Sequence, residues 1–472
     1  MSKETYDDEA FRDSVGFIDE SGKRNFIYPK KPKGDFTKYR TWLSWGLLAL
    51  LFAGPFIRID GQPFLLLNVL ERKFVILGQV FWPQDFYLLV ILLITSVIFV
   101  IVFTAAFGRI FCGWVCPQTI FLEMVFRKLE YWLDGDRGQQ MRIANMPWNA
   151  EKIRRRMVKW SIFFVLSFAI ANVFLMYLVG SEKVFQMVSD GPGAHMGNFT
   201  ALLIFSAVFF GVFAWFREQA CIVVCPYGRL QGVLLDRNSI VIAYDKVRGE
   251  LRSRFRKNED REAVGKGDCI DCKQCVHVCP TGIDIRNGTQ LECVNCTACI
   301  DACDDIMDKI NKPRGLIRYA SENQISKSEK PRFTTRLKLY TTVLSVLLIV
   351  MGGLLFARST MQANILRLPG SNYKVDAEGM VTNLYQFKIL NKSNEVQNFT
   401  IVAEDFDDAV VKPAGKAELS AEIQTFAEGI LIISIPKESL ESSRETITLL
   451  IRSDDGTILG KTKVGFPGPL NR

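Results

Sequence analysis

Five long uncharged runs constrain this chain more than any other feature of its sequence. They cover residues 41–57, 86–107, 160–180, 199–216 and 339–357. A helix that crosses the hydrocarbon core of a bilayer needs about 20 predominantly apolar residues. The runs therefore predict about five transmembrane helices. The first run is the weakest candidate, because it is short and contains Gly54-Pro55.

Most of the chain must nevertheless lie in water. Hydrophobic residues make up 49% of the 472 residues, but 23% are charged and the net charge is +8. These values exclude both an ordinary soluble enzyme and a disordered chain. The polar first 40 residues contain no cleavable signal peptide. We therefore expect a membrane protein that carries water-exposed domains.

The distribution of lysine and arginine predicts the orientation of the helices. Residues 1–40 carry 9 of them and residues 108–159 carry 10, whereas the loops 58–85 and 181–198 carry 3 and 1. Short cytoplasmic loops are rich in these residues. The N-terminal tail, the loop 108–159 and the segment 217–338 are thus predicted to be cytoplasmic, and the chain after residue 357 to be periplasmic.

Eight of the twelve cysteines form two similar runs within the segment predicted to be cytoplasmic. The first is Cys269, Cys272, Cys275 and Cys279, and the second is Cys293, Cys296, Cys299 and Cys303. Disulfides are disfavoured in the reducing cytoplasm, so clustered cysteines there indicate metal ligands or redox thiols. The first run is followed by Pro280 and matches the two-cluster ferredoxin pattern C-x2-C-x2-C-x3-C-P, whereas Asp304 follows the second run.

This pattern predicts two [4Fe-4S] clusters with crossed fourth ligands. One ligand set is Cys269, Cys272, Cys275 and Cys303, and the other is Cys293, Cys296, Cys299 and Cys279. Two zinc sites are the alternative, but zinc does not require a third cysteine at this spacing. His277 lies inside the first run and is predicted to be a neighbour of the cluster rather than a ligand.

The remaining four cysteines form an internal repeat of the motif C-x3-C-P. Cys112 and Cys116 follow the second apolar run, and Cys221 and Cys225 follow the fourth. The spacing of four residues predicts that both thiols of a pair share a helical face, and the proline predicts a helix boundary or kink. Amphipathic stretches at 119–133 and 227–235 then follow and could lie along the inner membrane surface. Soft thiolates in this arrangement suit Cu(I), zinc or iron, with buried inert cysteines as the alternative.

Two further segments have weaker chemical signals. His195 is followed by Met196, and this pair could contact copper, haem or a quinone, but a role at the start of a helix is favoured. The highly charged connector 248–261 is interpreted as a solvated or lipid-facing stretch rather than as a binding site.

The last part of the chain alternates between apolar and polar residues. Segments with this pattern occur at 381–390, 397–403, 429–435, 446–451 and 458–464, separated by Asn, Asp, Gly and Pro turns. The strand number favours an antiparallel sandwich of immunoglobulin-like type over residues 369–472, although the Cys-Trp-Cys signature of antibody domains is missing. No nucleophile-base pair occurs there, and the chain contains no glycine-rich phosphate loop.

The predicted fold is therefore an α-helical membrane protein with a cytoplasmic two-cluster ferredoxin-like domain and a C-terminal immunoglobulin-like sandwich. The expected order is a basic tail (1–40), two membrane helices (41–107), a cytoplasmic loop with the first C-x3-C-P motif (108–159), two membrane helices (160–216), a cytoplasmic segment with the second motif and the ferredoxin domain at about 260–310 (217–338), a fifth helix (339–357) and the sandwich (369–472).

This combination resembles the FixG/CcoG family of cytochrome c oxidase accessory proteins. The likeness extends over nearly the whole chain and includes the basic segment Tyr28-Pro29-Lys30-Lys31-Pro32-Lys33-Gly34. The resemblance implies a multi-pass protein of the bacterial inner membrane that reduces Cu(II) to Cu(I) for assembly of the cbb-type oxidase. Copper would be its substrate or bound ion, and Cys112, Cys116, Cys221 and Cys225 would be the catalytic residues that hold it.

Two other functions remain open from the sequence. The cysteine motifs are shared with quinol-oxidising membrane ferredoxins similar to the NapH and NosR groups, and the five-span layout with an external sandwich favours the first family. The third alternative is a non-catalytic scaffold for oxidase assembly. Expected partners are membrane lipid, a copper chaperone, oxidase subunits, a cytoplasmic or quinol electron donor and a second copy of the chain, whereas no nucleic acid is expected.

Overall fold

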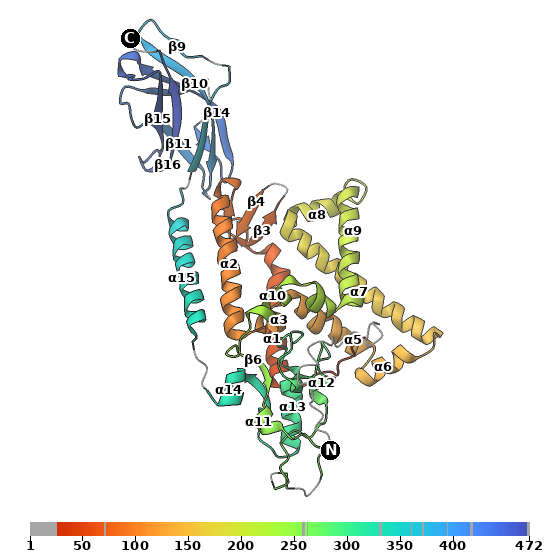
Figure 1. The fold of residues 1–472 in the computed structure, drawn as a ribbon. Helices are drawn as coiled ribbons and strands as arrows, with labels where there is room; N and C mark the ends of the chain where they lie inside the picture. Colours follow the sequence, from red (N-terminus) through yellow and green to blue (C-terminus); the bar gives the residue numbers. More distant parts are fainter. Residues whose placement is uncertain are drawn as a thin grey trace. The chain divides into compact units, whose positions relative to one another are not determined.

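The computed structural model describes residues 26–69, 72–256, 260–261, 263–329, 333–359, 361–370, 372–393, 395–415 and 419–469. The basic tail predicted for residues 1–40 is thus described only from Phe26 onward. The chain divides into two compact units, residues 1–350 and residues 351–472. Figure 1 shows the helical first unit and the strands of the second.

Four helices are long and apolar enough to cross a membrane, among the residues that the structure describes. They are α2 (Phe86–Phe107), α7 (Ala150–Val179), α9 with its π-helical extension η5 (Met196–Phe216) and α15 (Thr335–Phe356). Their long apolar sequences explain why they remain helical with so few buried side chains: the exposed faces suit lipid rather than a protein core. These helices confirm four of the five predicted runs, and α7 and α15 begin earlier than predicted.

The remaining run, residues 41–57, forms most of a shorter helix and the turn that ends it. Helix α1 (Asp35–Ala53) begins with Asp35, Lys38 and Arg40 in its first two turns, and the 3-10 turn η2 (Gly54–Phe56) ends it at the glycine and proline. Its side chains Arg40, Ser44 and Leu48 are buried at intervals of four residues, so one face of α1 packs against the protein.

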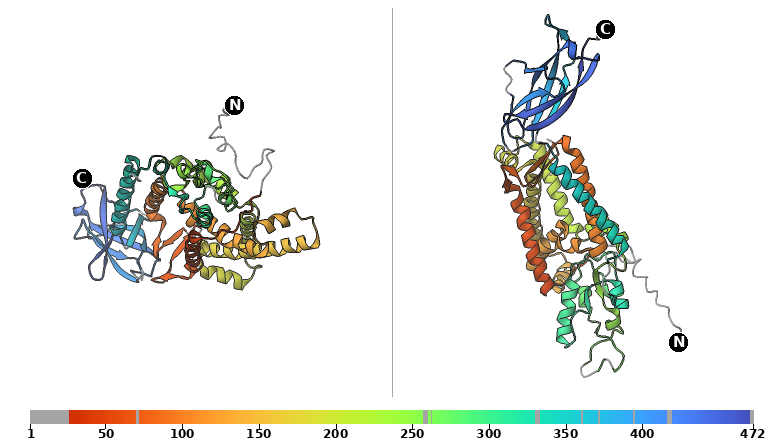
Figure 2. Two further views of the ribbon diagram at one scale, coloured as in Figure 1. Left: turned by 90° about the horizontal axis from the view of Figure 1, so that it is seen from below. Right: turned by 90° about the vertical axis from the view of Figure 1, so that its left-hand side faces the viewer.

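Short helices lie around one end of these long ones, and they carry the cysteine motifs and their flanks (Figure 2). They are α3 (Ile110–Trp114), α4 (Pro117–Ile120), the π-helix η4 (Phe121–Phe126), α5 (Arg127–Leu133), α6 (Arg137–Asn145), the π-helix η6 (Ala220–Val224), α10 (Pro226–Leu234), α11 (Lys246–Gly249), α12 (Gln274–His277), η7 (Ile285–Asn287), α13 (Ala298–Lys309) and α14 (Glu322–Lys327). Helix α8 (Ser181–Asp190) joins the other ends of α7 and α9.

The stretch 119–133 packs inside the protein rather than along a membrane surface. Phe121, Leu122 and Phe126 are almost completely buried, and they pack with Phe163 of α7 and Phe213 of η5. The rings of Phe126 and Phe213 stack with their centroids 4.7 Å apart. Burial of these large apolar side chains fixes the segment after the first C-x3-C-P motif to two membrane helices.

Small sheets occur in the first unit as well, although the sequence indicated no strands there. The loop between α1 and α2 folds into the strand pair β1 (Arg58–Ile59) and β2 (Gln62–Pro63) and the sheet β3 (Leu65–Asn68), β4 (Lys73–Ile76) and β5 (Gln79–Phe81). Strands β6 (Val241–Tyr244) and β7 (Ile317–Ala320) pair antiparallel and close the ferredoxin-like segment at its two ends.

The second unit is an antiparallel sandwich, as predicted. One sheet has the order β12 (Val410–Pro413), β14 (Phe426–Pro436), β10 (Met380–Asn391) and β8 (Met361–Arg367), with β9 (Lys374–Val375) also paired to β10. The other has the order β13 (Ser420–Ala421), β11 (Gln397–Ala403), β15 (Arg444–Ser453) and β16 (Ile458–Pro467). The buried side of each strand supplies the core. The sandwich begins at β8, before the predicted start at residue 369.

Candidate metal centres

The two ferredoxin-like runs adopt the same backbone turn. In each run the residue before the second cysteine and the residue after it have a positive φ: Asp271 (51°) and Lys273 (56°), then Asn295 (53°) and Thr297 (66°). Left-handed residues turn the chain sharply between consecutive cysteines. Lys273 is then the N-cap residue of α12, and Thr297 is the N-cap residue of α13. The shared conformation wraps the first three thiols of each run in the same way.

Thiols of the two runs lie near one another. Burial and then the nearby Cys275, Cys269 and Cys272 raise the pKa of Cys303. Burial likewise raises the pKa of Cys299 well above its usual value, and the nearby Cys296, Cys293 and Cys279 raise this pKa further. The fourth cysteine of each run therefore lies with the first three of the other run.

These groups fit iron-sulfur clusters in their chemistry. Burial raises the pKa of Cys275 and Cys293 to about 12, so the thiols would ionise at neutral pH only beside a compensating cation. Among the described residues, no three side chains of His, Cys, Asp or Glu come close enough to hold a single metal ion. Four thiols in each group match the number of ligands that a four-iron cluster needs.

Unpartnered buried donors near the second run support the same fit. The Nη2 atom of Arg40 and the Nδ2 atom of Asn295 have no hydrogen-bond partner among the described residues, and both side chains are at most 4% exposed. The charge of Arg40 partly offsets the burial that raises the pKa of Cys296 to about 11. Cluster sulfurs accept hydrogen bonds of this kind.

The C-x3-C-P motifs break their helices at the second cysteine. Helix α3 contains Cys112 and ends at Trp114, and Cys116 is extended before α4 begins at Pro117. Cys225 is extended in the same way before α10 begins at Pro226. Proline disfavours a helical conformation in the residue before it. The predicted boundary is confirmed, but the prediction that each pair shares one helical face is wrong.

The internal repeat is visible in the backbone. Four residues before the first cysteine of each motif, Gly108 has φ 58° and ψ −134°, and Arg217 has φ 55° and ψ −125°. The amide of Cys116 donates to the carbonyl of Phe111 over 2.9 Å, and that of Cys225 donates to Ala220 over 2.8 Å. Both long helices therefore end and restart in the same way.

The thiols of the two C-x3-C-P motifs, here called the membrane-side thiols, lie near one another. They are Cys112, Cys116, Cys221 and Cys225. Burial and then Cys116, Cys112 and Cys225 raise the pKa of Cys221 to about 12. The Cys112 thiol donates to Gln231 Oε1 over 3.2 Å, and Arg109 Nε donates to the same oxygen over 2.8 Å. Gln231 of α10 is fully buried, so residues beside one motif orient a cysteine of the other.

The first motif lies directly against the second ferredoxin-like run. A Cβ atom on Gly113 would come within 2.5 Å of the Val294 carbonyl oxygen and 2.6 Å of that of Asn295, so only glycine fits. Cys112 and Cys296 belong to the same hydrophobic cluster. Arg40 Nε of α1 also donates to the Gly113 carbonyl over 2.6 Å. The membrane-side thiols and one predicted cluster site are thus neighbours.

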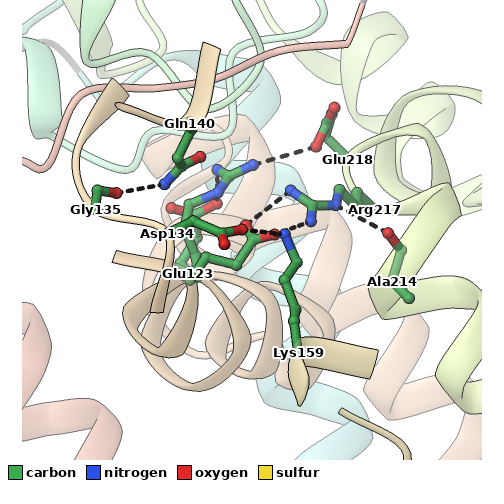
Figure 3. A network of polar contacts seen from close by, with 10 residues as sticks. Glu123, Asp134, Gly135, Gln140, Lys159, Ala214, Arg217 and Glu218 are labelled. Carbon is green, nitrogen blue, oxygen red and sulfur yellow. Dashed lines mark hydrogen bonds and ion pairs between the residues drawn. The ribbon is translucent and has the colours of Figure 1, made fainter. Parts of the chain in front are cut away.

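A buried network of charges holds the two motifs to the membrane helices (Figure 3). Arg127 contacts Glu123 and Glu218, and Arg217 contacts Glu130. Lys159 of α7 contacts Glu130 and Asp134, each over 2.7 Å. This network was not predicted from the sequence. Its signal was the spacing of Glu123, Arg127, Glu130 and Asp134, which places four charges on one face of an otherwise apolar helix.

The two histidines take local positions. His195 is the N-cap residue of α9, and its Nε2 atom lies 3.2 Å from Asp190 Oδ2. His277 is the last residue of α12, and its backbone carbonyl accepts a hydrogen bond from the Lys30 amide over 2.7 Å.

Three known protein families match parts of the chain. A family described as a 4Fe-4S dicluster domain matches residues 216–322, and one described as a 4Fe-4S binding domain matches residues 89–138. The third, described as the IG-like fold at the C-terminal of FixG, matches residues 351–469. The matches cover all twelve cysteines and the sandwich.

Several relatives match most of the chain. Protein RdxB of Cereibacter sphaeroides is 34% identical over 80% of this chain and 82% of its own. Protein RdxA of the same organism is 32% identical over 94% of this chain and 98% of its own. The nitrogen fixation protein FixG of Rhizobium meliloti is 30% identical over 84% of this chain and 82% of its own.

Proposed function

This chain belongs to the FixG family of membrane iron-sulfur electron-transfer proteins, and we propose that it reduces Cu(II) to Cu(I) for assembly of a cbb-type cytochrome c oxidase. The observation that carries the proposal is the position of Cys112, which packs with Cys296 of the second ferredoxin-like run and lies near the other three thiols of the C-x3-C-P motifs. Reduction of Cu(II) takes one electron, and Cu(I) prefers thiolate ligands.

The chain's own residues orient and hold the copper in this proposal. Cys269, Cys272, Cys275 and Cys303 would hold one cluster and Cys279, Cys293, Cys296 and Cys299 the other, and such clusters supply single electrons when bound. Cys112, Cys116, Cys221 and Cys225 would bind the copper. We expect a pair of these thiolates to hold Cu(I).

Gln231 and Arg109 would fix the orientation of Cys112 during this reaction. Both side chains are buried, and Gln231 Oε1 accepts one hydrogen bond from Arg109 Nε and one from the Cys112 thiol. Loss of the thiol proton on metal binding would leave Gln231 free to turn its unpartnered Nε2 group toward the thiolate. The site would thus exclude water and lose one proton for each thiol that binds.

The proposed location is the bacterial inner membrane, with the ferredoxin-like segment in the cytoplasm and the sandwich in the periplasm. The lysine and arginine counts of the loops support this orientation. A copper chaperone and oxidase subunits are the proposed partners.

Paired cysteine substitutions test the copper chemistry. In Cys112→Ser/Cys116→Ser and in Cys221→Ser/Cys225→Ser, we expect lower copper binding and Cu(II) reduction, while the iron-sulfur signals in electron paramagnetic resonance persist. Val115→Ser and Val223→Ser are matched controls, because each adds a hydroxyl inside a motif and keeps both thiols. Intact copper binding and reduction in both double variants would contradict the proposal.

The two other functions predict different results. A quinol-oxidising protein would show quinol-dependent reduction of its clusters without a response to copper. A scaffold would support oxidase assembly unchanged after substitution of the predicted cluster ligands.

The copper proposal also makes a prediction for cells. Cells with the paired cysteine variants should lack active oxidase mainly when copper is scarce.

A further inference from the structure

Arg109 lies buried between α10 and the second ferredoxin-like run. Its side chain is only 3% exposed. Its Nε atom donates to Gln231 Oε1 over 2.8 Å, and its Nη1 atom donates to the carbonyl of Leu291, two residues before Cys293. A Cβ atom on Gly228 would lie 3.0 Å from Arg109 Nη2, so the glycine leaves room for the guanidinium. One charged group thus contacts α10 and the second run together.

The charge of Arg109 has no carboxylate to balance it. Within the described part of the chain, its hydrogen bonds end at a side-chain amide oxygen and a peptide oxygen, and it forms no ion pair with Asp or Glu. Removal of a charge from water is costly unless an opposite charge compensates for it. A guanidinium buried in this way therefore favours an anion beside it.

The internal repeat shows that the two motifs differ in this respect. Arg109 stands three residues before Cys112, and Glu218 stands three residues before Cys221. Glu218 is also 3% exposed, but it pairs with Arg127 over 3.3 Å. Equivalent positions of the two repeats thus each carry a buried charge. Among the described residues, only the charge of the second repeat has an opposite partner.

The anions that could balance Arg109 are the thiolates on its two sides. The Cys112 thiol shares the Gln231 Oε1 acceptor with Arg109, and Leu291 lies just before Cys293. Burial raises the pKa of Cys112 and of Cys293, whereas the charge of Arg109 lowers both. Cysteines bind metals as thiolates. Copper at Cys112 and a cluster at Cys293 would therefore each place negative charge near the guanidinium.

We propose that Arg109 is a positioning residue whose charge serves as the common counter-ion of the copper-bound Cys112 thiolate and of the cluster held at the second run. The inference rests on the proposed function, because that function assigns copper to Cys112. Two neutral thiols that bind Cu(I) release both protons, so the copper site gains one negative charge. Reduction likewise adds one electron to the cluster. A buried cation between the two sites stabilises both forms.

A purely structural role is the alternative, in which the guanidinium only bridges the oxygens of Gln231 and Leu291. Substitutions can separate charge from shape. Arg109→Gln removes the charge but keeps a hydrogen-bond donor, and Arg109→Lys keeps the charge on a side chain of different shape. Gln231→Glu keeps the arginine and replaces the amide beside it with a carboxylate, which balances the charge in place.

Redox titration of the copper-free, full-length holoprotein in detergent measures the effect on the cluster by electron paramagnetic resonance. In Arg109→Gln and Gln231→Glu, we expect one reduction step to become roughly tenfold less favourable, which corresponds to a potential lower by about 60 mV for one electron. Arg109→Lys should stay close to wild type. Arg229→Gln is the matched control, because Arg229 is an exposed arginine of α10 whose charge is screened by solvent.

Competition with the Cu(I) chelator bathocuproine disulfonate measures the effect on the copper site of the same proteins. We expect Cu(I) binding to be roughly tenfold weaker in Arg109→Gln and Gln231→Glu, since loss of a group behind a metal ligand costs about 10 to 100-fold in affinity. Arg109→Lys and Arg229→Gln should bind Cu(I) nearly as wild type does.

Three results would overturn the inference. They are unchanged potentials or unchanged Cu(I) affinity in Arg109→Gln, equal losses in Arg109→Lys and Arg109→Gln, and shifts of the same size in Arg229→Gln. Iron analysis shows whether each variant keeps its clusters, and if Arg109→Gln loses iron, Gln231→Glu decides instead. Wild type that binds no Cu(I) would overturn the proposed function, whereas the titration of copper-free protein decides the role of Arg109 at the cluster separately.

Discussion

At the scale of single residues, the contact between the membrane motif and the ferredoxin-like run depends on Gly113 and Arg40. Gly113 has no space for a side chain, and Arg40 places one donor on the Gly113 carbonyl and leaves Nη2 without a partner among the described residues. One residue thus permits the approach of two backbones, and the other places a positive charge between them. Each role can be removed by a single substitution.

Gly113→Ala should separate the motif from the second run. The added Cβ meets two backbone carbonyls, which cannot move as a flexible side chain could, so we expect a loss of about 1–3 kcal/mol in stability. Thermal unfolding in detergent measures it. Gly46→Ala is the control, because nothing lies within 4 Å of its Cβ position in α1, and helix propensity favours alanine there. Equal stability of the two variants would contradict this contact.

Arg40→Leu should lower the reduction potential of the cluster at the second run. Removal of a buried positive charge disfavours the added electron, and an electrostatic loss of about 1.4 kcal/mol corresponds to about 60 mV for one electron. Redox titration followed by electron paramagnetic resonance measures the shift. Lys33→Leu, which removes a charge from a residue outside the buried set, is the control. A potential that is unchanged in Arg40→Leu would exclude the charge as a determinant.

At the scale of elements, the buried network joins η4 and α5 to α7 and to the end of η5. Glu130 is its centre, because it contacts both Arg217 and Lys159. Arg217 holds a positive φ at the position where the first repeat has Gly108, and its contacts with Glu130 and with the Phe26 ring stabilise that backbone. The network therefore sets where the second motif begins.

Glu130→Ala should destabilise the protein by about 3–5 kcal/mol, because it removes the carboxylate that pairs with buried Arg217 and leaves buried Lys159 with Asp134 alone. Glu182→Ala, which breaks the exposed pair with Arg58, should cost less than about 1 kcal/mol. Thermal unfolding compares the two. A small loss in Glu130→Ala would mean that Asp134 and Glu218 compensate.

The same carboxylate predicts how stability depends on pH. Arg217 and Lys159 overcome the effect of burial and lower the pKa of Glu130 to about 2. A lowered pKa adds stability above the unfolded value of about 4.3, and this stability is lost as the pH falls toward 2. Wild type should thus lose stability over that acidic range more steeply than Glu130→Gln. Identical pH profiles would contradict the assignment.

Periodicity predicted the long helices and most strands, but it could not predict how the motifs pack. The runs 86–107 and 397–403 match α2 and β11 because their patterns are long and regular. The strands between α1 and α2 are too short for such a pattern, and β8 precedes the predicted domain start. The contacts of Gly113, Gln231 and Glu130 join residues far apart in sequence, so single-sequence reasoning had no access to them.

At the scale of the whole molecule, all the thiols belong to the first unit. The sandwich unit, residues 351–472, contains neither cysteine nor histidine. It therefore lacks thiolates and imidazoles as metal ligands. All the thiols that could hold iron or copper lie in the first unit.

Metal analysis of anaerobically purified protein checks the cofactor content. We expect about eight irons per chain from two four-iron clusters. Cys275→Ser should damage one cluster and weaken the other through the shared fold, whereas Val276→Ala should keep both. Stoichiometric zinc without iron would contradict the assignment. About twelve irons would place a third cluster on the membrane-side thiols and contradict the copper proposal.

The exchange of fourth cysteines between the two runs also sets an order in time for biosynthesis. Cys279 is translated with the first run, but it lies with the thiols of the second, and Cys303 does the reverse. If these sets bind iron, neither is complete until residue 299 has left the ribosome, and the set that includes Cys303 is complete only after that residue. Delivery of iron to the nascent chain would then become useful only shortly before α15 (Thr335–Phe356) emerges for insertion. Maturation and membrane insertion of the last helix would therefore follow each other closely.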